Sequence, residues 1–402
     1  MSMQYNDKAM KSIYSLALIL SLTMISNISR AQSLEGIQDM AAEQTAALDL
    51  IAEQPSSQDL AVDLTSAQDV VTSESAVFEP AAYNGFDFFA SEDMLEMTLT
   101  FDIKGLVKSK NKPEYFDAAL TVKESDTDSI TQHIKVKARG YFRCNFCSFP
   151  PLMMKFKNKN DEAIQVEGKT LKLVTHCHQT PKFDQYVLKE YLAYKLLNNL
   201  DSDYSFKTRL VRIHYVDINK SKNSYTAYGI LIENETMLAK RNNAVIIKSD
   251  KFTPKDMNTR DMNRMALFNF MIGNTDWSVQ MQHNIKILMS FNEPTGKGIP
   301  VVYDFDYSGL VNTYYAAPFE ELPIKTVTER YYQGVCTGEN ELKPLIEEFA
   351  GLKDRMLGTI RDFPYLSKND KKQAESYISS FYSMYKNQNY MISQLNSTCR
   401  TF

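Results

Sequence analysis

The stretch NFMIGNTDWSVQMQHNIKIL, from Asn269 to Leu288, joins the end of one predicted element to the start of the next. Apolar residues at helical spacing lead into Gly273-Asn274, and both of these residues tolerate the left-handed backbone angles that end a helix. The strand IKILMS follows at 285–290. A helix stop explains Gly-Asn, but it does not explain the carboxylate of Asp276 in the turn that comes next.

On the N-terminal side of this stretch the sequence predicts mainly strands, and on its C-terminal side mainly helices. Alternating apolar residues predict strands at 94–103, 117–124, 132–142, 150–158, 169–175, 208–218 and 225–234, the first three of them in an antiparallel sheet. Helical spacing predicts helices at 183–200, 257–272, 342–357 and 370–395, the first of which packs on the sheet. An apolar strand at 299–309 completes a hairpin with 285–290. Strands early and helices late predict an α+β fold.

The first residues resemble a signal peptide. Lys8 and Lys11 precede 13 residues, Ile13 to Ile25, that are mostly apolar, and small residues around Arg30 suit cleavage. This run is too short to span a bilayer, and no later run is long enough. The first cysteine is Cys144, far from the cleavage point, so lipid anchoring is disfavoured. Residues 1–31 therefore predict export to the periplasm or the extracellular space, with no integral membrane segment in the mature chain.

Charge divides the remainder into two parts. Residues 32–103 carry 15 acidic and no basic side chains, whereas 104–402 carry a net charge of +9. Residues 32–90 are rich in Ala, Gln, Ser, Asp and Glu, and we expect a disordered acidic linker there, followed by a folded domain over 91–402. The basic charge suggests a solvated surface or a phosphate-bearing ligand. No aromatic and basic module typical of RNA binding is present, so no nucleic-acid partner is expected.

The chain has five cysteines, an odd count. In an exported protein they favour disulfides, for example Cys147 with Cys177 and Cys336 with Cys399, although spacing alone does not establish connectivity. The alternative is a zinc site, and it would draw on Cys144, Cys147, His176 and His178.

Four side chains offer the chemistry of phosphoryl transfer. That reaction needs a carboxylate to orient the acceptor hydroxyl, oxygen ligands for Mg²⁺ and a lysine for the phosphates. Asp276, Asn284, Asp304 and Lys155 supply these groups, with Lys157 or Lys172 as alternatives to Lys155. Asp276 and Asp304 flank the predicted hairpin, so we expect them to converge on one cleft. The alternative is that they are solvated turn residues.

Several motifs together resemble the kinase-like family of spore coat protein H (CotH). The two most specific are GNTDW (273–277) and YDFDYSG (303–309), and weaker ones are KARGYF (137–142), FPPLMMKFK (149–157), LKEYLAYKLL (188–197) and YGILIENE (228–235). The resemblance implies a protein-kinase-like two-lobed fold. Its antiparallel-sheet N-lobe would cover about 91–233 and its mainly helical C-lobe about 234–402.

The resemblance also implies roles and cofactors. The cofactors would be ATP and Mg²⁺ or Mn²⁺, and the unknown acceptor would be a protein with Ser, Thr or Tyr hydroxyls. The implied residues are Asp276 as the catalytic aspartate, Asn284 and Asp304 as metal ligands, Asp306 in reserve, Lys155 and Arg139 near the phosphates, Glu190 holding the lysine, and Glu233 near the adenine. Ser278, the eight-residue spacing from Asp276 to Asn284 and the lack of a Gly-rich loop depart from the family pattern.

Three functions remain open from the sequence. The leading hypothesis is an exported ATP-dependent phosphotransferase. The others are a non-catalytic envelope or surface binding protein and a zinc hydrolase at the Cys/His cluster. Residues 322–336 combine basic and aromatic side chains. Two predictions follow from this composition: the stretch lines an acceptor groove, or it forms a connection packed on the C-terminal part.

Overall fold

The computed structural model describes residues 86–401 except 126, 158–161, 221–223, 250, 293–295 and 386. The predicted signal peptide and nearly all of the predicted linker lie outside the described residues. Residues 82–402 belong to one compact unit, and the account below concerns its described part.

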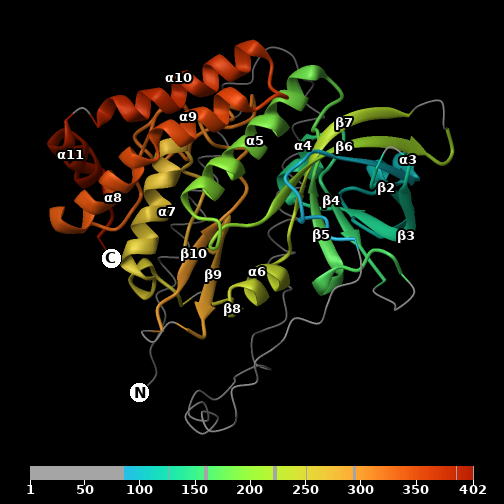
Figure 1. Cartoon of the computed structure of the whole chain (residues 1–402), viewed down its shortest axis with the longest axis horizontal. Helices are drawn as coiled ribbons and strands as arrows, with labels where there is room; N and C mark the ends of the chain where they lie inside the picture. Colours follow the sequence, from blue (N-terminus) through green and yellow to red (C-terminus); the bar gives the residue numbers. More distant parts are fainter. Residues whose placement is uncertain are drawn as a thin grey trace, which may run out of the picture. The chain divides into compact units, whose positions relative to one another are not determined.

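Seven of the described strands close into a barrel (Figure 1). They are β1 (Leu95–Phe101), β2 (Phe116–Lys123), β3 (Ser129–Ala138), β4 (Leu152–Lys155), β5 (Thr170–Val174), β6 (Thr208–Asp217) and β7 (Tyr225–Ile232). Their order is β1-β2-β3-β4-β5-β7-β6, and β6 closes the ring by pairing in parallel with β1. The other neighbours pair antiparallel.

Side chains fill the inside of the barrel. On β1, Leu95, Met97, Leu99 and Phe101 are buried while the residues between them are more exposed, as the two-residue period of a strand requires. The corresponding residues of the other strands join them in one hydrophobic cluster. The barrel therefore encloses a core and leaves its rim and outer face for function.

The prediction of a protein-kinase-like two-lobed fold is wrong. The strands expected to form an antiparallel N-lobe sheet close into a mixed barrel, and the part expected to be mainly helical contains a second sheet. The alternating pattern of β1 suits an open sheet and a barrel equally. Closure depends on the pairing of Leu95 with Val211 and of Phe101 with Asp217, which are over a hundred residues apart in the chain. No local pattern encodes such a contact.

The rest of the unit packs helices around an antiparallel sheet of order β10-β9-β8. The strands are β8 (Ala244–Ile247), β9 (Ile285–Ser290) and β10 (Ile299–Val302). The longer helices are α5 (Pro181–Leu200), α7 (Thr259–Ile272), α8 (Glu339–Gly351), α9 (Lys353–Asp362), α10 (Lys368–Met384) and α11 (Gln388–Thr398), and the shorter ones are α3 (Ile103–Lys108), α4 (Tyr141–Phe146) and α6 (Glu235–Arg241), with 3₁₀ turns at Glu167–Lys169 and Pro254–Asp256.

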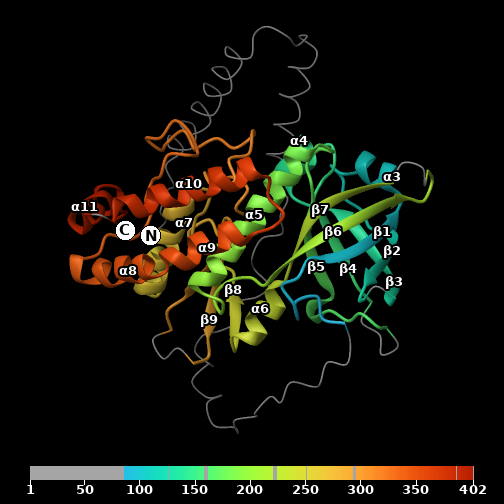
Figure 2. The same cartoon turned by 45° about the horizontal axis from the view of Figure 1, so that its top comes forward.

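Helix α5 lies between the barrel and the C-terminal helices. It contacts β6 and β7 of the barrel and also α9, and both views show it between the barrel and the C-terminal helices (Figures 1 and 2). Twelve of its 20 residues are buried, among them Lys189 and Glu190. The expected packing of this helix on the sheet is confirmed.

Most predicted elements are present, but three boundaries differ. Residues 139–142 do not continue β3: the chain turns at Gly140 (φ +81°) and enters helix α4. Strand β10 ends at Val302, so Asp304 and Asp306 follow the strand instead of lying in it. The two predicted C-terminal helices are each divided, with breaks near Leu352 and after Met384.

Two disulfides join Cys147 to Cys177 and Cys336 to Cys399, as the sequence analysis suggested. Cys144 is the remaining cysteine, and it is buried. Disulfides of this kind persist in oxidising compartments and are consistent with an exported protein. Among the described residues, no helix has both the length and the apolar character that crossing a bilayer requires.

Candidate functional site

The turn after α7 holds Asp276 in a defined position. Gly273 ends the helix in the left-handed conformation (φ +67°). The buried Asn274 side chain donates to Asn269 Oδ1 (2.8 Å) and accepts the backbone N–H of Asp276 (3.1 Å). Gln333 Nε2 donates to the carbonyl of Thr275 (3.0 Å). These contacts answer the question that the sequence raised: the Gly-Asn stop also aims the following carboxylate.

The β9–β10 hairpin brings Asn284 and Asp304 to this turn. Asn284 Nδ2 donates to Asp276 Oδ2 (2.9 Å), and His283 Nε2 lies 2.8 Å from Asp276 Oδ1. Asn284 and Asp304 both have positive φ, +50° and +67°. Side chains other than glycine rarely adopt such angles, and they cluster at functional sites where the surroundings hold them. The Asp304 N–H donates to Tyr194 Oη of α5 (2.9 Å), which fixes the turn.

Asp306 lies buried behind Asp304 and is bound to the segment that follows. Tyr315 Oη donates to Asp306 Oδ2 (2.8 Å), and Thr313 Oγ1 donates to the Asp306 carbonyl (3.1 Å). Burial and, next, the charge of Asp304 raise the pKa of Asp306. Two neighbouring carboxylates in a low-dielectric site repel each other when both are ionised. A cation bound between them would offset that repulsion.

The barrel supplies basic groups on the opposite side. A cavity of about 330 Å³ opens between the rim of the barrel and the hairpin, and we call it the candidate cavity. Its polar lining consists of Arg139, Arg143, Lys172, Asp276, His283, Asn284, Asp304 and Asp306, together with several tyrosines. The predicted convergence of Asp276 and Asp304 on one cleft is therefore observed.

Lys172 is the lysine that reaches the candidate cavity. It lies on β5, and its Nζ is 4.5 Å from the centre of the Tyr303 ring. Burial, and then the charge of Arg139, lower its pKa to about 8. At neutral pH the amine is still protonated. An anion bound in the cavity would stabilise its positive charge.

Lys155, the first choice from sequence, does not line the cavity. It lies at the end of β4 with an exposed side chain, and its Nζ is 5.1 Å from the centre of the Tyr115 ring. Lys157 is exposed just beyond it. On both strands the lysine follows a buried residue and is itself less buried. Only the strand order, which places β5 beside β7 and close to the hairpin, distinguishes Lys172 from Lys155.

Arg139 lines the candidate cavity, and helix α4 adds Arg143 to the same lining. Arg143 is half-buried, and its Nη2 donates to the carbonyl of Thr175. Helix α4 borders the cavity through Tyr141, Phe142 and Arg143. The Cys147–Cys177 disulfide holds the end of this helix against the segment before α5.

Glu190 lies close to the cavity but is not paired with Lys172. It is only 2% exposed, and within the described part of the chain its Oε1 has no hydrogen-bond partner. Burial, followed by the charges of Asp306 and Asp304, raises its pKa well above the usual value, while Arg143 and Arg139 oppose that rise. Glu190 thus lies near the carboxylates and arginines that line the cavity, although it does not line the cavity itself.

Glu233, which the resemblance would place near the adenine, is engaged in hydrogen bonds within the fold. It is buried at the end of β7, where Arg241 Nη2 donates to its Oε1 at 2.8 Å and the N–H of Lys207 donates at 2.7 Å. These bonds join β7 to α6 and to the start of β6. Its neighbour Ile232 lines the cavity, whereas Glu233 does not.

The geometry does not favour the zinc alternative. Cys147 is used in a disulfide, and Cys144 donates to the carbonyl of Arg139. His176 is buried and stacked on Phe149, with ring centres 5.0 Å apart, and burial lowers its pKa to about 3. In the described ranges, no three His, Cys, Asp or Glu side chains form a metal-binding group.

Sequence reasoning assigned no role to Arg143 or His283. Arg143 was missed because residues 132–142 read as one strand, although Gly140 in that stretch was a signal for a turn. His283 is beside Asn284 in the sequence, but its contact with Asp276 depends on a reversal of the chain at Gln282 (φ +47°). Neither residue carries a local pattern that distinguishes it from a surface side chain.

Comparison with models of protein families gives no match, and neither does comparison with curated proteins.

Proposed function

We propose that the protein is an exported, ATP-dependent phosphotransferase that acts on a hydroxyl group of an acceptor protein. The observation that carries the proposal is the meeting of Asp276, Asn284 and Asp304 with Lys172 and Arg139 in one cavity. Carboxylate and amide oxygens facing basic side chains suit a divalent cation and a polyphosphate together. The resemblance of residues 273–309 to the spore coat protein H family points to the same chemistry.

Each residue has a role in this proposal. Asp276 would accept a hydrogen bond from the acceptor hydroxyl and take its proton as the phosphoryl group moves. Asn274 and Asn284 keep that carboxylate oriented through their hydrogen bonds. Lys172 and Arg139 would hold the phosphates, and Lys172 takes the place that the sequence analysis gave to Lys155.

The donor set fits a magnesium or manganese ion. Asp304 supplies a carboxylate, with Asp306 beside it. Asn284 adds an amide oxygen, since its hydrogen bond to the Asp276 carboxylate uses only the amide nitrogen. Mg²⁺ is commonly held by one or two carboxylates, and substrate phosphates and water complete its shell. When bound, such an ion neutralises negative charge on the phosphates.

The two disulfides and the predicted signal peptide support a place of action outside the cytoplasm, in the periplasm or the extracellular space. ATP would then have to be available in that compartment, and the acceptor would be another exported or surface protein.

A second candidate is a non-catalytic envelope or surface binding protein, and one observation favours it. Both carboxylate oxygens of Asp276 already have partners, His283 on Oδ1 and Asn284 on Oδ2. A structural hydrogen-bond network of this kind can hold a buried carboxylate without catalysis. An acceptor hydroxyl would have to share Asp276 Oδ1 or displace His283 from it.

Label transfer separates the two functions. The protein is incubated with γ-labelled ATP, Mg²⁺ or Mn²⁺ and a mixture of exported proteins, and it is compared with Asp276→Asn, Asp304→Asn and Lys155→Ala. We expect transfer by the wild type and by Lys155→Ala, with losses of two orders of magnitude or more in the two aspartate variants. Thermal melting of each variant checks that it is folded. Equal labelling by all four proteins would exclude the proposed enzyme.

A further inference from the structure

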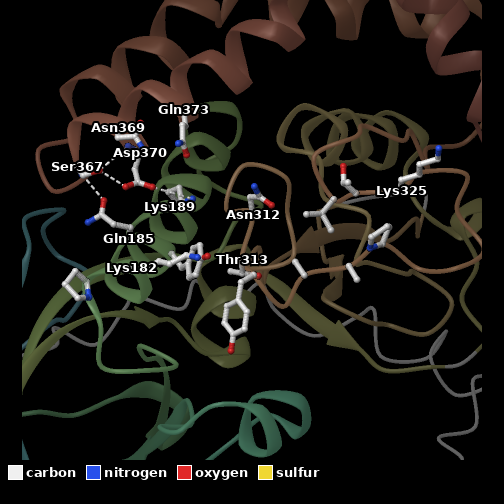
Figure 3. Close-up of a pocket in the computed structure, with 18 residues that line it drawn as sticks. Lys182, Gln185, Lys189, Asn312, Thr313, Lys325, Ser367, Asn369, Asp370 and Gln373 are labelled. Carbon is white, nitrogen blue, oxygen red and sulfur yellow. Dashed lines mark hydrogen bonds and ion pairs between the residues drawn. The ribbon is translucent and has the colours of Figure 1, made fainter. Parts of the chain in front are cut away.

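A second, larger hollow lies beside the candidate cavity. It is an open groove of about 820 Å³ between the first turns of α5, the start of α10 and the loop residues 312–318 and 325–327 (Figure 3). None of its lining residues is shared with the candidate cavity. Part of the stretch 322–336, which the sequence analysis considered as a possible acceptor groove, forms one of its walls. We call this hollow the lysine groove.

The charges in the lysine groove are mostly positive. Its ionisable lining side chains, apart from tyrosines, are Lys182, Lys189, Lys325 and Asp370. Figure 3 shows Lys182 and Lys189 on one side of Asn312 and Thr313, and Lys325 on the other. In the described part of the chain, neither the Lys182 nor the Lys325 ammonium forms an ion pair, and the Glu329 carboxylate beside Lys325 accepts the backbone N–H of that residue (3.1 Å). A chain lying along the groove would therefore meet positive charge at both ends.

The one carboxylate in the groove does not cancel this charge. Lys189 Nζ is 3.8 Å from Asp370 Oδ1, a long contact, and the lysine side chain is only 7% exposed. The other oxygen of Asp370 accepts the hydroxyl of Ser367 at the start of α10. Burial lowers the pKa of Lys189, and Asp370 only partly offsets that effect. A second carboxylate near this ammonium would stabilise its positive charge further.

Uncharged hydrogen-bonding groups line the space between the lysines. Asn312, Asn369 and Gln373 carry side-chain amides, and Thr313 and Thr326 carry hydroxyls. Figure 3 shows Asn369 and Gln373 at the α10 side of the groove and Asn312 across from them. Amide N–H groups complement carboxylate oxygens and also backbone carbonyls.

Hydrogen bonds link the lysine groove to the candidate cavity. Thr313 lines the groove, and its hydroxyl donates to the carbonyl of Asp306. Tyr314 also lines the groove, and Tyr315, the next residue, donates to the Asp306 carboxylate in the cavity. The Tyr314 ring packs on Phe146 of α4, with ring centres 5.4 Å apart. The same short segment therefore lines the groove and holds Asp306, which lines the candidate cavity.

We propose that the lysine groove binds an acidic segment of the acceptor protein, so that a hydroxyl flanked by Asp or Glu residues is presented to Asp276. The inference rests on the proposed phosphotransferase function and names its substrate class. Positive side chains at both ends of the groove would pair with carboxylates of the acceptor and would disfavour acceptors rich in Lys or Arg.

The test uses the full chain and two fluorescent serine peptides of equal length, one with Glu around the serine and one with Gln at the same positions. The double variant Lys182→Glu/Lys325→Glu reverses the charge of the groove. Lys155→Glu is the matched control, because it is an exposed lysine that lines neither hollow. Steady-state labelling gives KM and kcat for each peptide, and fluorescence anisotropy without nucleotide gives the affinity for each peptide.

We expect the wild type and Lys155→Glu to have a KM about tenfold lower for the Glu peptide than for the Gln peptide. The double variant should lose this preference and should keep its kcat for the Gln peptide and its MgATP-induced thermal shift. A double variant that still prefers the Glu peptide, or a wild type that has the same KM for both peptides, overturns the inference and leaves the proposed function standing.

The anisotropy measurement keeps the two proposals apart. If no protein labels either peptide, the proposed function has failed, and binding alone decides about the groove. Tighter binding of the Glu peptide by the wild type, lost in the double variant, would support an acidic ligand in the groove. Equal binding of the two peptides by the wild type would refute it.

Discussion

At the scale of single residues, Gly273 is the position where side-chain size matters most for the site. Its φ of +67° is strained for other residues, and a Cβ added there would come within 2.0 Å of Tyr377 Oη. The carbonyl of Gly273 also accepts the N–H of Gly309, so the same residue ties the Asp276 turn to the Asp304–Gly309 segment.

Gly273→Ala should therefore destabilise the protein by at least about 1–2 kcal/mol. Urea unfolding followed by circular dichroism measures the change. Gly358→Ala is the control: Gly358 lies within α9, and an added Cβ would meet nothing within 4 Å. That substitution should stabilise by about 0.5–1 kcal/mol, because alanine favours a helix. If the two variants unfold alike, the close packing at Gly273 is not what holds the turn.

Under the proposed function, Lys172 should make nucleotide binding depend on pH. Burial lowers its pKa to about 8, so the free protein has a charged amine below that pH and loses the charge above it. A bound polyphosphate favours the charged form and raises the pKa, so affinity should fall as the pH rises above about 8.

Calorimetric titration of MgATP between pH 7 and 9.5 tests this dependence. The wild type and Lys155→Arg should weaken together across this range, whereas Lys172→Arg should weaken much less because a guanidinium stays protonated. Parallel weakening of all three proteins would mean that another group is responsible for the pH dependence.

At the scale of elements, each disulfide fastens a different part of the fold. Cys147–Cys177 ties the end of α4, which borders the candidate cavity, to the segment before α5. Cys336–Cys399 joins the connection before α8 to the residue after α11, and neither of its cysteines lines the cavity. The two bonds form a natural pair for separating stability from function.

Replacing both cysteines of either bond by serine should lower the free energy of unfolding by about 2–5 kcal/mol. Only Cys147→Ser/Cys177→Ser should also weaken MgATP binding, because it frees the helix that carries Arg143. Denaturant titration measures the first effect, and calorimetry at a temperature where both variants are folded measures the second. Equal affinity in the two double variants would show that α4 needs no such attachment to form the site.

At the scale of the whole molecule, closure of the barrel depends on β1. This strand pairs with β2 on one side and with β6 on the other. Its inward side chains, such as Leu99 and Phe101, are completely buried. Without β1, two strand edges and the barrel core would be open to solvent and to other chains.

A chain that begins at Ala82 should keep a cooperative thermal transition, since residues 82–402 form one compact unit. A chain that begins at Asp102 lacks β1 and should aggregate or lose that transition. Size-exclusion chromatography and thermal melting distinguish these outcomes. A monomeric, cooperative protein from the shorter chain would show that the other six strands close without β1.

The sequence by itself determined the local elements and the acidic half of the candidate site. Helix and strand periods placed the longer elements but missed β8 and the short helices α3, α4 and α6. Gly273-Asn274 marked the end of α7, and the hairpin between Asp276 and Asp304 predicted their convergence. These features depend on neighbours within a few residues, so a pattern in the chain carries them. The failures also have local causes, such as residues 139–142, where strand-like alternation continued past the turn at Gly140.

Only the tertiary structure decided the barrel, the identity of the lysine and the presence of Arg143 and His283 at the site. Lys155 and Lys172 lie on adjacent strands, each after a buried residue, and the order and register of the strands bring only Lys172 to the cavity that holds the carboxylates. The same holds for β1 and β6, whose parallel pairing turned an expected sheet into a closed barrel. Contacts between distant segments depend on how whole elements pack, and many pairings satisfy the same local pattern.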